Sequence, residues 1–157
     1  MITCARATAN GSAPGVNPKG PAMKLIPQIS LAFDGQCEAA FRFYERCLDG
    51  SITYMQTWGE SPMAAQAPEG WSGKIAHATL KVGDTAFLGS DVPASVYTKP
   101  QGFSIILQMD DPAAAERVFN ALAEKASVDM PLQQTYWARR FATFVDQFGI
   151  SWSINCE

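Results

Sequence analysis

The stretch "AAFRFYERCLDGSITYM" (39–55) decides the fold, because "AAERVFNALAEKASVDM" (114–130) repeats its pattern. The two stretches align without a gap at an offset of 75 residues. Each begins with an amphipathic helical pattern and ends in a segment that reads as a strand. In the first copy, one helical stripe holds the apolar residues Ala40, Phe43, Tyr44, Cys47 and Leu48. A helix followed by a strand therefore occurs twice.

A second repeat lies further out, where "VGDTAFLGS" (82–90) resembles "FGISWSINC" (148–156) at an offset of 66 residues. Both copies place a glycine turn before a strand. Working outward from the two repeats, we expect the order strand, helix, strand, strand, strand in each half. The expected elements of the first half are 26–33, 37–48, 51–58, 74–82 and 85–90, and those of the second are 102–109, 112–125, 126–133, 139–146 and 149–156.

The sequence thus predicts an α+β fold of two tandem βαβββ modules, 24–91 and 102–157, with a linker at 91–101. Neither half buries its sheet alone, so the two are expected to pair across a shared concave space. Aligning the first strands places Ile105, Leu107 and Met109 on the helix side of the second module. Pro112 suits the first turn of the second helix, and Asp111 is a candidate cap.

Composition excludes several classes of protein. The chain has 157 residues, a net charge of −3 and scattered Lys and Arg residues, which does not suit a nucleic-acid binder. No apolar run approaches the roughly 20 residues of a membrane span. The four cysteines show no C-x-x-C spacing, and without an export signal we expect reduced thiols and a cytoplasmic location. Residues 1–22 read as a disordered leader, with Met23 as a candidate start.

Four stretches together resemble the vicinal oxygen chelate superfamily, which includes glyoxalase I, bleomycin-resistance proteins and extradiol dioxygenases, and more narrowly its PhnB-like branch. They are "FDGQCEAAFRFYERCLDG" (33–50), "KIAHATLKVGDTAFLGSD" (74–91), "GFSIILQMDDPAAAERVFNAL" (102–122) and "MPLQQTYWARRFATFVDQFGISWSINC" (130–156). The resemblance covers residues 23–157. It implies a glyoxalase-like open, curved barrel of mixed β-sheet and a homodimer. Some PhnB-like chains carry a methyltransferase label, but no Gly-rich strand-to-helix turn supports a nucleotide cofactor here.

Metal-dependent members of that superfamily place His, Gln and Glu ligands on the first and last strand of each module. Transferred position by position, this chain offers Gln28, Phe87, Ser104 and Ser153. A phenyl ring is no ligand, two hydroxyls are poor ones, and no carboxylate balances a divalent cation. A shift by one residue at Phe87, to Ala86 or Leu88, brings no ligand either. We therefore expect no tightly held metal and no other cofactor, with a divalent metal as the alternative.

His77 is the only histidine, and we place Ile75 and Thr79 on its face of the strand. It is either a structural residue or a base in the cavity, because it alone titrates near neutrality.

The rings of Trp58, Trp71, Tyr136 and Trp137 either serve packing and dimer contact or line a pocket for a flat or apolar ligand, with Arg139 holding an anionic group. The Gly/Pro-rich loop 59–73 is either a lid or a mobile loop. The complete set of candidate ligand-binding residues is Gln28, Ser30, Trp58, Trp71, His77, Phe87, Ser104, Trp137, Arg139 and Ser153.

Two classes of function follow from these residues. The first is a metal-free protein that binds a small molecule on the concave sheet, as bleomycin-resistance proteins do. The second is a glyoxalase- or dioxygenase-like enzyme with an atypical metal site that includes Gln28 and His77. An interaction module whose purpose is its dimer is a third. The sequence leaves open whether the modules of one chain face each other or those of a partner chain.

Overall fold

The computed structural model describes residues 25–157, so the predicted leader and Met23 lie outside the described residues. The predicted fold class, α+β with two βαβββ modules, is confirmed. The first module contains β1 (Ile29–Phe33), α1 (Cys37–Cys47), β2 (Ser51–Thr57), a 3-10 turn η1 (Ala64–Gln66), β3 (Ile75–Val82) and β4 (Thr85–Asp91). The second contains β5 (Ile105–Met109), α2 (Pro112–Leu122), β6 (Ser127–Gln133), β7 (Arg140–Val145) and β8 (Ser151–Cys156).

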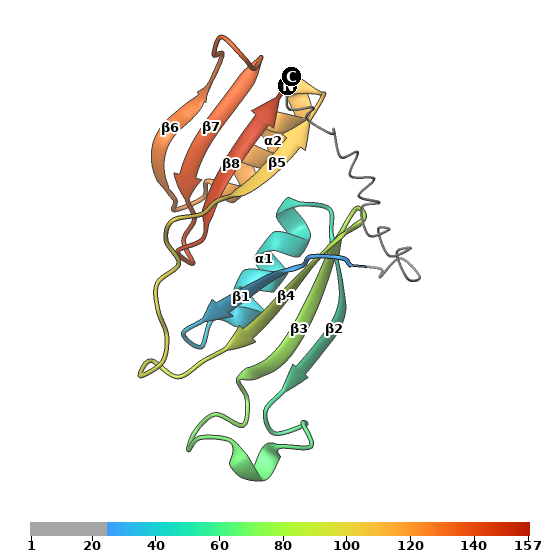
Figure 1. Ribbon diagram of the computed structural model, residues 1–157, viewed down its shortest axis with the longest axis vertical. Coiled ribbons are helices and arrows are strands. Elements are labelled where there is room, and N and C mark those ends of the chain that lie inside the picture. The colour runs from blue at the N-terminus through green and yellow to red at the C-terminus, as the bar shows by residue number, and fades with distance from the viewer. Residues whose placement is uncertain (1–24) are drawn as a thin grey trace, which may run out of the picture.

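Each module forms its own four-stranded mixed sheet (Figure 1). The strand order is β1-β4-β3-β2 in the first sheet and β5-β8-β7-β6 in the second. In both sheets the first and last strands of the module pair in parallel, and the other pairs are antiparallel. The first strand of each module, β1 or β5, is therefore an edge strand.

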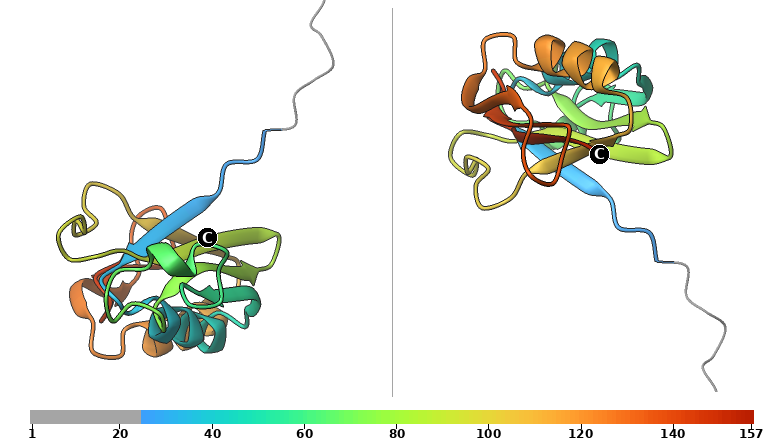
Figure 2. Two further views of the ribbon diagram at one scale, coloured as in Figure 1. Left: turned by 90° about the horizontal axis from the view of Figure 1, so that it is seen from below. Right: turned by 90° about the horizontal axis from the view of Figure 1, so that it is seen from above.

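Both helices lie on the same side of the strands, as the two views of Figure 2 show. Residues that alternate along each strand accordingly divide between a helix-covered side and an uncovered side. Leu31 and Phe33 of β1 are buried under α1, whereas Ala32 between them is exposed. The prediction that Ile105, Leu107 and Met109 lie on the helix side is confirmed, because all three belong to the core or pack against it.

One hydrophobic core on the helix side joins the two modules. Tyr44 of α1 packs edge-on against Trp152 of β8, with ring centroids 5.3 Å apart, and donates a hydrogen bond to Asp146 at 2.6 Å. Phe87 of β4 also contacts Trp152, at 6.3 Å. Among the described residues the modules share their helix side, and neither helix covers the opposite faces of the two sheets.

The N-terminus of α1 is fixed to its sheet by a buried carboxylate. Asp91, at the end of β4, accepts hydrogen bonds from the backbone N–H groups of Cys37 and Ile75, both at 2.8 Å. A buried carboxylate requires such donors, because desolvation alone would make it costly.

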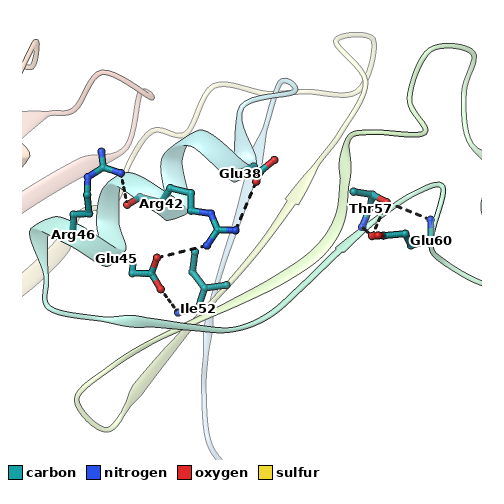
Figure 3. Close-up of polar contacts among 7 residues, drawn as sticks. All are labelled: Glu38, Arg42, Glu45, Arg46, Ile52, Thr57 and Glu60. Carbon is teal, nitrogen blue, oxygen red and sulfur yellow. Dashed lines mark hydrogen bonds and ion pairs between the residues drawn. The ribbon is translucent and has the colours of Figure 1, made fainter.

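A polar network covers the exposed side of the same helix (Figure 3). Arg42 lies between Glu38 and Glu45, at 3.8 and 3.7 Å. Glu45 also accepts the N–H of Ile52 at 2.8 Å, which ties α1 to β2. Exposed ion pairs of this kind contribute little stability individually, so the hydrogen bond to β2 is the more important contact.

Candidate functional site

We use the term open face for the side of the two sheets that the helices leave uncovered. Strand register identifies its residues, since directly paired residues point to the same side. One row crosses the first sheet through Ser30, Leu88, Thr79 and Tyr54. The corresponding row in the second sheet is Ile106, Ser153, Thr143 and Met130. The central rows of the open face therefore consist of hydroxyl and apolar side chains without a formal charge.

Two predicted residues meet on the second sheet. The Oγ atoms of Ser104 and Ser153 lie 3.2 Å apart, within hydrogen-bond distance. Ser153 is only 6% exposed, and Ser104, directly before β5, is exposed to solvent. The pair is thus a neutral hydrogen-bonding group on the open face, and either hydroxyl can donate.

The side chains of Trp137 and Phe141, which we call the aromatic wall, lie on the same sheet. Trp137, which is 46% exposed, packs edge-on against Phe141 with centroids 5.2 Å apart. Phe141 pairs with Asn155 in register, two residues beyond Ser153 on β8. Indole and phenyl rings beside a hydroxyl pair suit a ligand with a flat apolar body and a polar substituent.

Phe87, a predicted ligand-binding residue, does not lie on the open face. Phe87 is buried against Trp152 on the helix side, and Leu88 is the residue of β4 that reaches the open face, paired with Ser30. The one-residue shift that the sequence left open is the correct alignment. Because side chains alternate along a strand, an error of one residue exchanges the core face for the open one. Gln28 lies exposed just before β1 begins.

His77 lies exposed on β3, with its ring tilted against that of Tyr54 at 5.8 Å. Within residues 25–157 no hydrogen bond or ion pair joins it to a carboxylate. The expectation that Ile75 shares its face was wrong, since Ile75 is buried on the helix side. A register shift between Gln56 and Thr57 reverses the alternation at this point.

The loop that carries Trp58 and Trp71 is closed at its base by two backbone hydrogen bonds, Trp58 N to Lys74 O and Gly59 N to Ser72 O. A further bond links Thr57 to Glu60 at its start (Figure 3). Both tryptophans are half-buried, and within the described residues the Trp58 indole N–H has no hydrogen-bond partner. No aromatic contact in residues 25–157 joins either ring to Trp137, so the predicted rings form two separate groups.

Arg139 lies next to Trp137 but is bound to backbone oxygens. Its guanidinium donates to the carbonyl of Asp110 at 2.5 Å and, through Nε, to that of Glu157 at 2.7 Å. These bonds fix the last residue of the described chain against the end of β5. The guanidinium remains exposed beside the aromatic wall.

A metal ion does not fit the side chains found on the open face. In the part of the chain that the structure describes, no three His, Cys, Asp or Glu side chains come together in a group that could hold a metal ion. The four transferred positions now read Gln28, Leu88, Ser104 and Ser153, which supply an amide and two hydroxyls. Divalent cations in proteins prefer carboxylate, imidazole or thiolate ligands.

None of the helices described is long and apolar enough to cross a membrane.

The strongest electrostatic perturbations lie in the core. Burial, with Asp91 and then Glu38 as smaller causes, raises the pKa of the Cys37 thiol far above its ordinary value. Burial and then the Asp146 carboxylate raise the pKa of the Tyr44 phenol in the same way. Both groups stay protonated, which suits packing and hydrogen bonding rather than nucleophilic chemistry.

Sequence reasoning missed several open-face residues, namely Phe141, Thr143 and Asn155. The alternation of β7, in which Ala142 and Phe144 are buried, could have identified Phe141 and Thr143. Asp146 was missed as well, because before a turn it reads as an ordinary turn residue. Only the structure shows that it accepts hydrogen bonds from four groups of two modules.

Comparison with known proteins agrees with this fold. The family described as 3-demethylubiquinone-9 3-methyltransferase matches residues 24–155. Protein YjdN of Escherichia coli is 32% identical over 141 residues, which cover 85% of this chain and 95% of that protein. The crystal structure of protein PA1353 from Pseudomonas aeruginosa is 44% identical with a TM-score of 0.78, covering 85% of this chain and 98% of that one. A glyoxylase/bleomycin resistance protein/dioxygenase domain from Frankia has the same fold, at 11% identity and a TM-score of 0.59 over 86% of this chain and 98% of that one.

Proposed function

Because the chain belongs to the PhnB-like, 3-demethylubiquinone-9 3-methyltransferase family of the vicinal oxygen chelate superfamily, we propose that it binds a small, flat, uncharged molecule on the open face without a tightly held metal. The observation that carries the proposal is the Ser104–Ser153 hydroxyl pair. It occupies two positions where metal-dependent members of the superfamily have ligands. A neutral pair there suits recognition by hydrogen bonds.

The walls around the pair define the class of ligand. Trp137 and Phe141 offer ring faces and edges, and Ile106 and Met130 supply apolar contacts from the same row as Ser153. Ligand sites of this kind combine apolar walls with a few polar groups that set orientation. The central rows carry no formal charge that could pair with a charged ligand. A phenol or an amide-bearing ring, by contrast, can form hydrogen bonds with the two hydroxyls.

We also propose that the binding-competent form is a homodimer. The open face exposes Tyr54, Ile106 and Trp137, which are 46%, 58% and 46% accessible. Large apolar side chains left exposed on a sheet without a covering layer favour an interface. A second copy laid over the open face would enclose the hydroxyl pair and exclude water from the ligand.

An enzyme with an atypical metal site is the alternative, and it would use Gln28 and His77. The exposed imidazole of His77 is the observation that favours it. A neutral imidazole and one amide still leave a dication without a carboxylate. Methyl transfer is not proposed, since the sequence lacks a Gly-rich turn for a nucleotide cofactor.

Calorimetric titration with 1-naphthol, a flat phenol that is neutral at pH 7, tests the proposal. We expect saturable binding that EDTA does not change. Ser153→Ala and Trp137→Ala should each weaken it about ten-fold, because each removes one of the two recognition elements. Tyr97→Ala, which removes a ring from the linker, is the control and should bind as the wild type does. Equal binding by Trp137→Ala and wild type, or binding that EDTA abolishes, would contradict the proposal.

A further inference from the structure

A cavity lies between the two modules and meets the open face at Ile106, the residue paired with Ser153. Its volume is about 520 Å³, and both modules line it. β1, the end of α1 and the β3–β4 hairpin contribute one wall, and β5 with α2 contributes the other. We call this space the module seam. Six of its lining side chains also pack against the hydrophobic core, namely Ile29, Leu48, Val82, Leu107, Met109 and Val118.

The seam is open because two edge strands border it. β1 is hydrogen-bonded only to β4 and β5 only to β8 among the described strands. All five residues of β5 line the seam. The free edge of that strand leaves backbone N–H and C=O groups available to a guest. The six core side chains consequently remain half-buried instead of being covered.

The side chains that line the seam indicate which class of molecule could bind there. Every described side chain that lines the seam is uncharged, and within residues 25–157 the only polar ones are Thr85 and Gln108, both exposed. A volume of this size lies within the range of about 300–1,000 Å³ typical of small-molecule sites. Water in a space with apolar walls makes few hydrogen bonds, so an apolar molecule displaces it favourably.

We propose that the module seam is a second binding site, for an uncharged and largely apolar molecule with one polar end, such as a medium-chain alcohol. The chain of the guest contacts Leu48, Leu107 and Val118. Its polar end lies near Thr85 or the free edge of β5. Binding here does not depend on the hydroxyl pair of the open face. Because both modules contact the guest, it also stabilises their packing against each other.

Methionine methyl groups give a direct test with 1-decanol as the probe. Met109 lines the seam, Met130 lies in the open-face row, and Met55 packs on the core beneath the first sheet. In full-length protein carrying ¹³C-methyl methionine, decanol should shift the Met109 signal saturably and leave those of Met130 and Met55 in place. A saturable shift of Met130 alone, or no shift of Met109 at solubility-limited decanol, would overturn the proposal.

Filling the seam supplies the second arm of the test. Val118→Phe adds a ring to the α2 wall, and we expect decanol affinity to fall about ten-fold or more. Val128→Phe makes the same change at an exposed position of β6 and should bind as the wild type does. Val82→Phe fills the seam from the opposite wall if Val118→Phe does not fold. Wild-type affinity in a folded seam-filling variant would overturn the proposal.

Discussion

Asp146 is the residue on which the joining of the two modules most depends. Its carboxylate is 4% exposed and accepts hydrogen bonds from Tyr44 Oη and Trp152 Nε1, and from the backbone N–H groups of Phe148 and Ile150. Only the Tyr44 bond crosses from the first module to the second. A buried carboxylate with this many donors is well solvated by the protein, so each donor lost leaves it less stable.

Tyr44→Phe removes the hydrogen bond between modules and keeps the ring that packs on Trp152. We expect the free energy of unfolding to fall by about 1.5–3 kcal/mol, as for other hydrogen bonds to charged groups. Urea denaturation measures the loss. Tyr54→Phe removes a hydroxyl from an exposed residue of β2 and should change stability by less than about 0.5 kcal/mol. Equal stability of the two variants would show that the Asp146 bond contributes nothing net.

The raised pKa values of Cys37 and Tyr44 predict sensitivity to alkali. The folded protein keeps both protons where the unfolded chain releases them, from about pH 8.5 for a thiol and about pH 10 for a phenol. The stability that they contribute is therefore complete below those values and is lost as the pH rises through them. Urea denaturation between pH 7 and 11 should show a steady fall, with a shallower slope above pH 10 in Tyr44→Phe. Parallel curves for wild type and variant would contradict this assignment.

At the scale of elements, the approach of α1 to β4 depends on Gly89. A Cβ atom there would lie 2.4 Å from the Phe41 ring and 3.0 Å from Cys37 Sγ, both fully buried. Gly89→Ala should therefore push the helix from its sheet and cost about 1–3 kcal/mol in thermal or urea unfolding. At Gly73 the same substitution meets nothing within 4 Å and should cause no loss. A fully stable Gly89→Ala would mean that α1 sits further from the sheet than described.

The start of α2 depends on a cap that the sequence predicted. Asp111 accepts the N–H groups of Ala113 and Ala114 at 3.0 and 3.2 Å. Asp111→Ala should lower stability by about 0.5–2 kcal/mol in urea denaturation. Asp110→Ala is the matched control, because the Asp110 side chain accepts no hydrogen bond within residues 25–157. A similar loss in both variants would point to a charge effect rather than capping.

The boundaries of helices and strands were predictable where a capping or turn residue marks them. They were less predictable where the pairing of a strand with its neighbour sets the boundary. The Asp111–Pro112 start of α2 was found from sequence. β1 and β5, by contrast, begin later than predicted, at Ile29 and Ile105, because the residues before them have no strand partner. The shift that buries Ile75 leaves no mark in a single sequence, since it arises from pairing with β2.

At the scale of the whole molecule, the duplication made the fold predictable. Two copies of one pattern constrain each other, and each separately specifies a strand, a helix and three strands. The site was less predictable, since it depends on which side of each strand a residue takes. Ser104 and Ser153 came together as their aligned positions implied, whereas Phe87 did not. Tyr44 of the first module contacts Asp146 and Trp152 of the second. These residues lie far apart in the sequence, so no local sequence pattern predicts the contact.

Metal content tests the central claim, metal-free binding on the open face, most directly. Full-length protein purified without chelator would be analysed for metals and then melted with nickel, zinc, manganese or iron(II). A metal at about 100 times its Kd would add roughly 2.7 kcal/mol of stability, which is several degrees in melting temperature. We predict substoichiometric metal and no such rise, because the open face offers an amide and hydroxyls instead of carboxylates. One equivalent of bound metal, or a clear rise that His77→Ala abolishes, would contradict the account and favour a metalloenzyme.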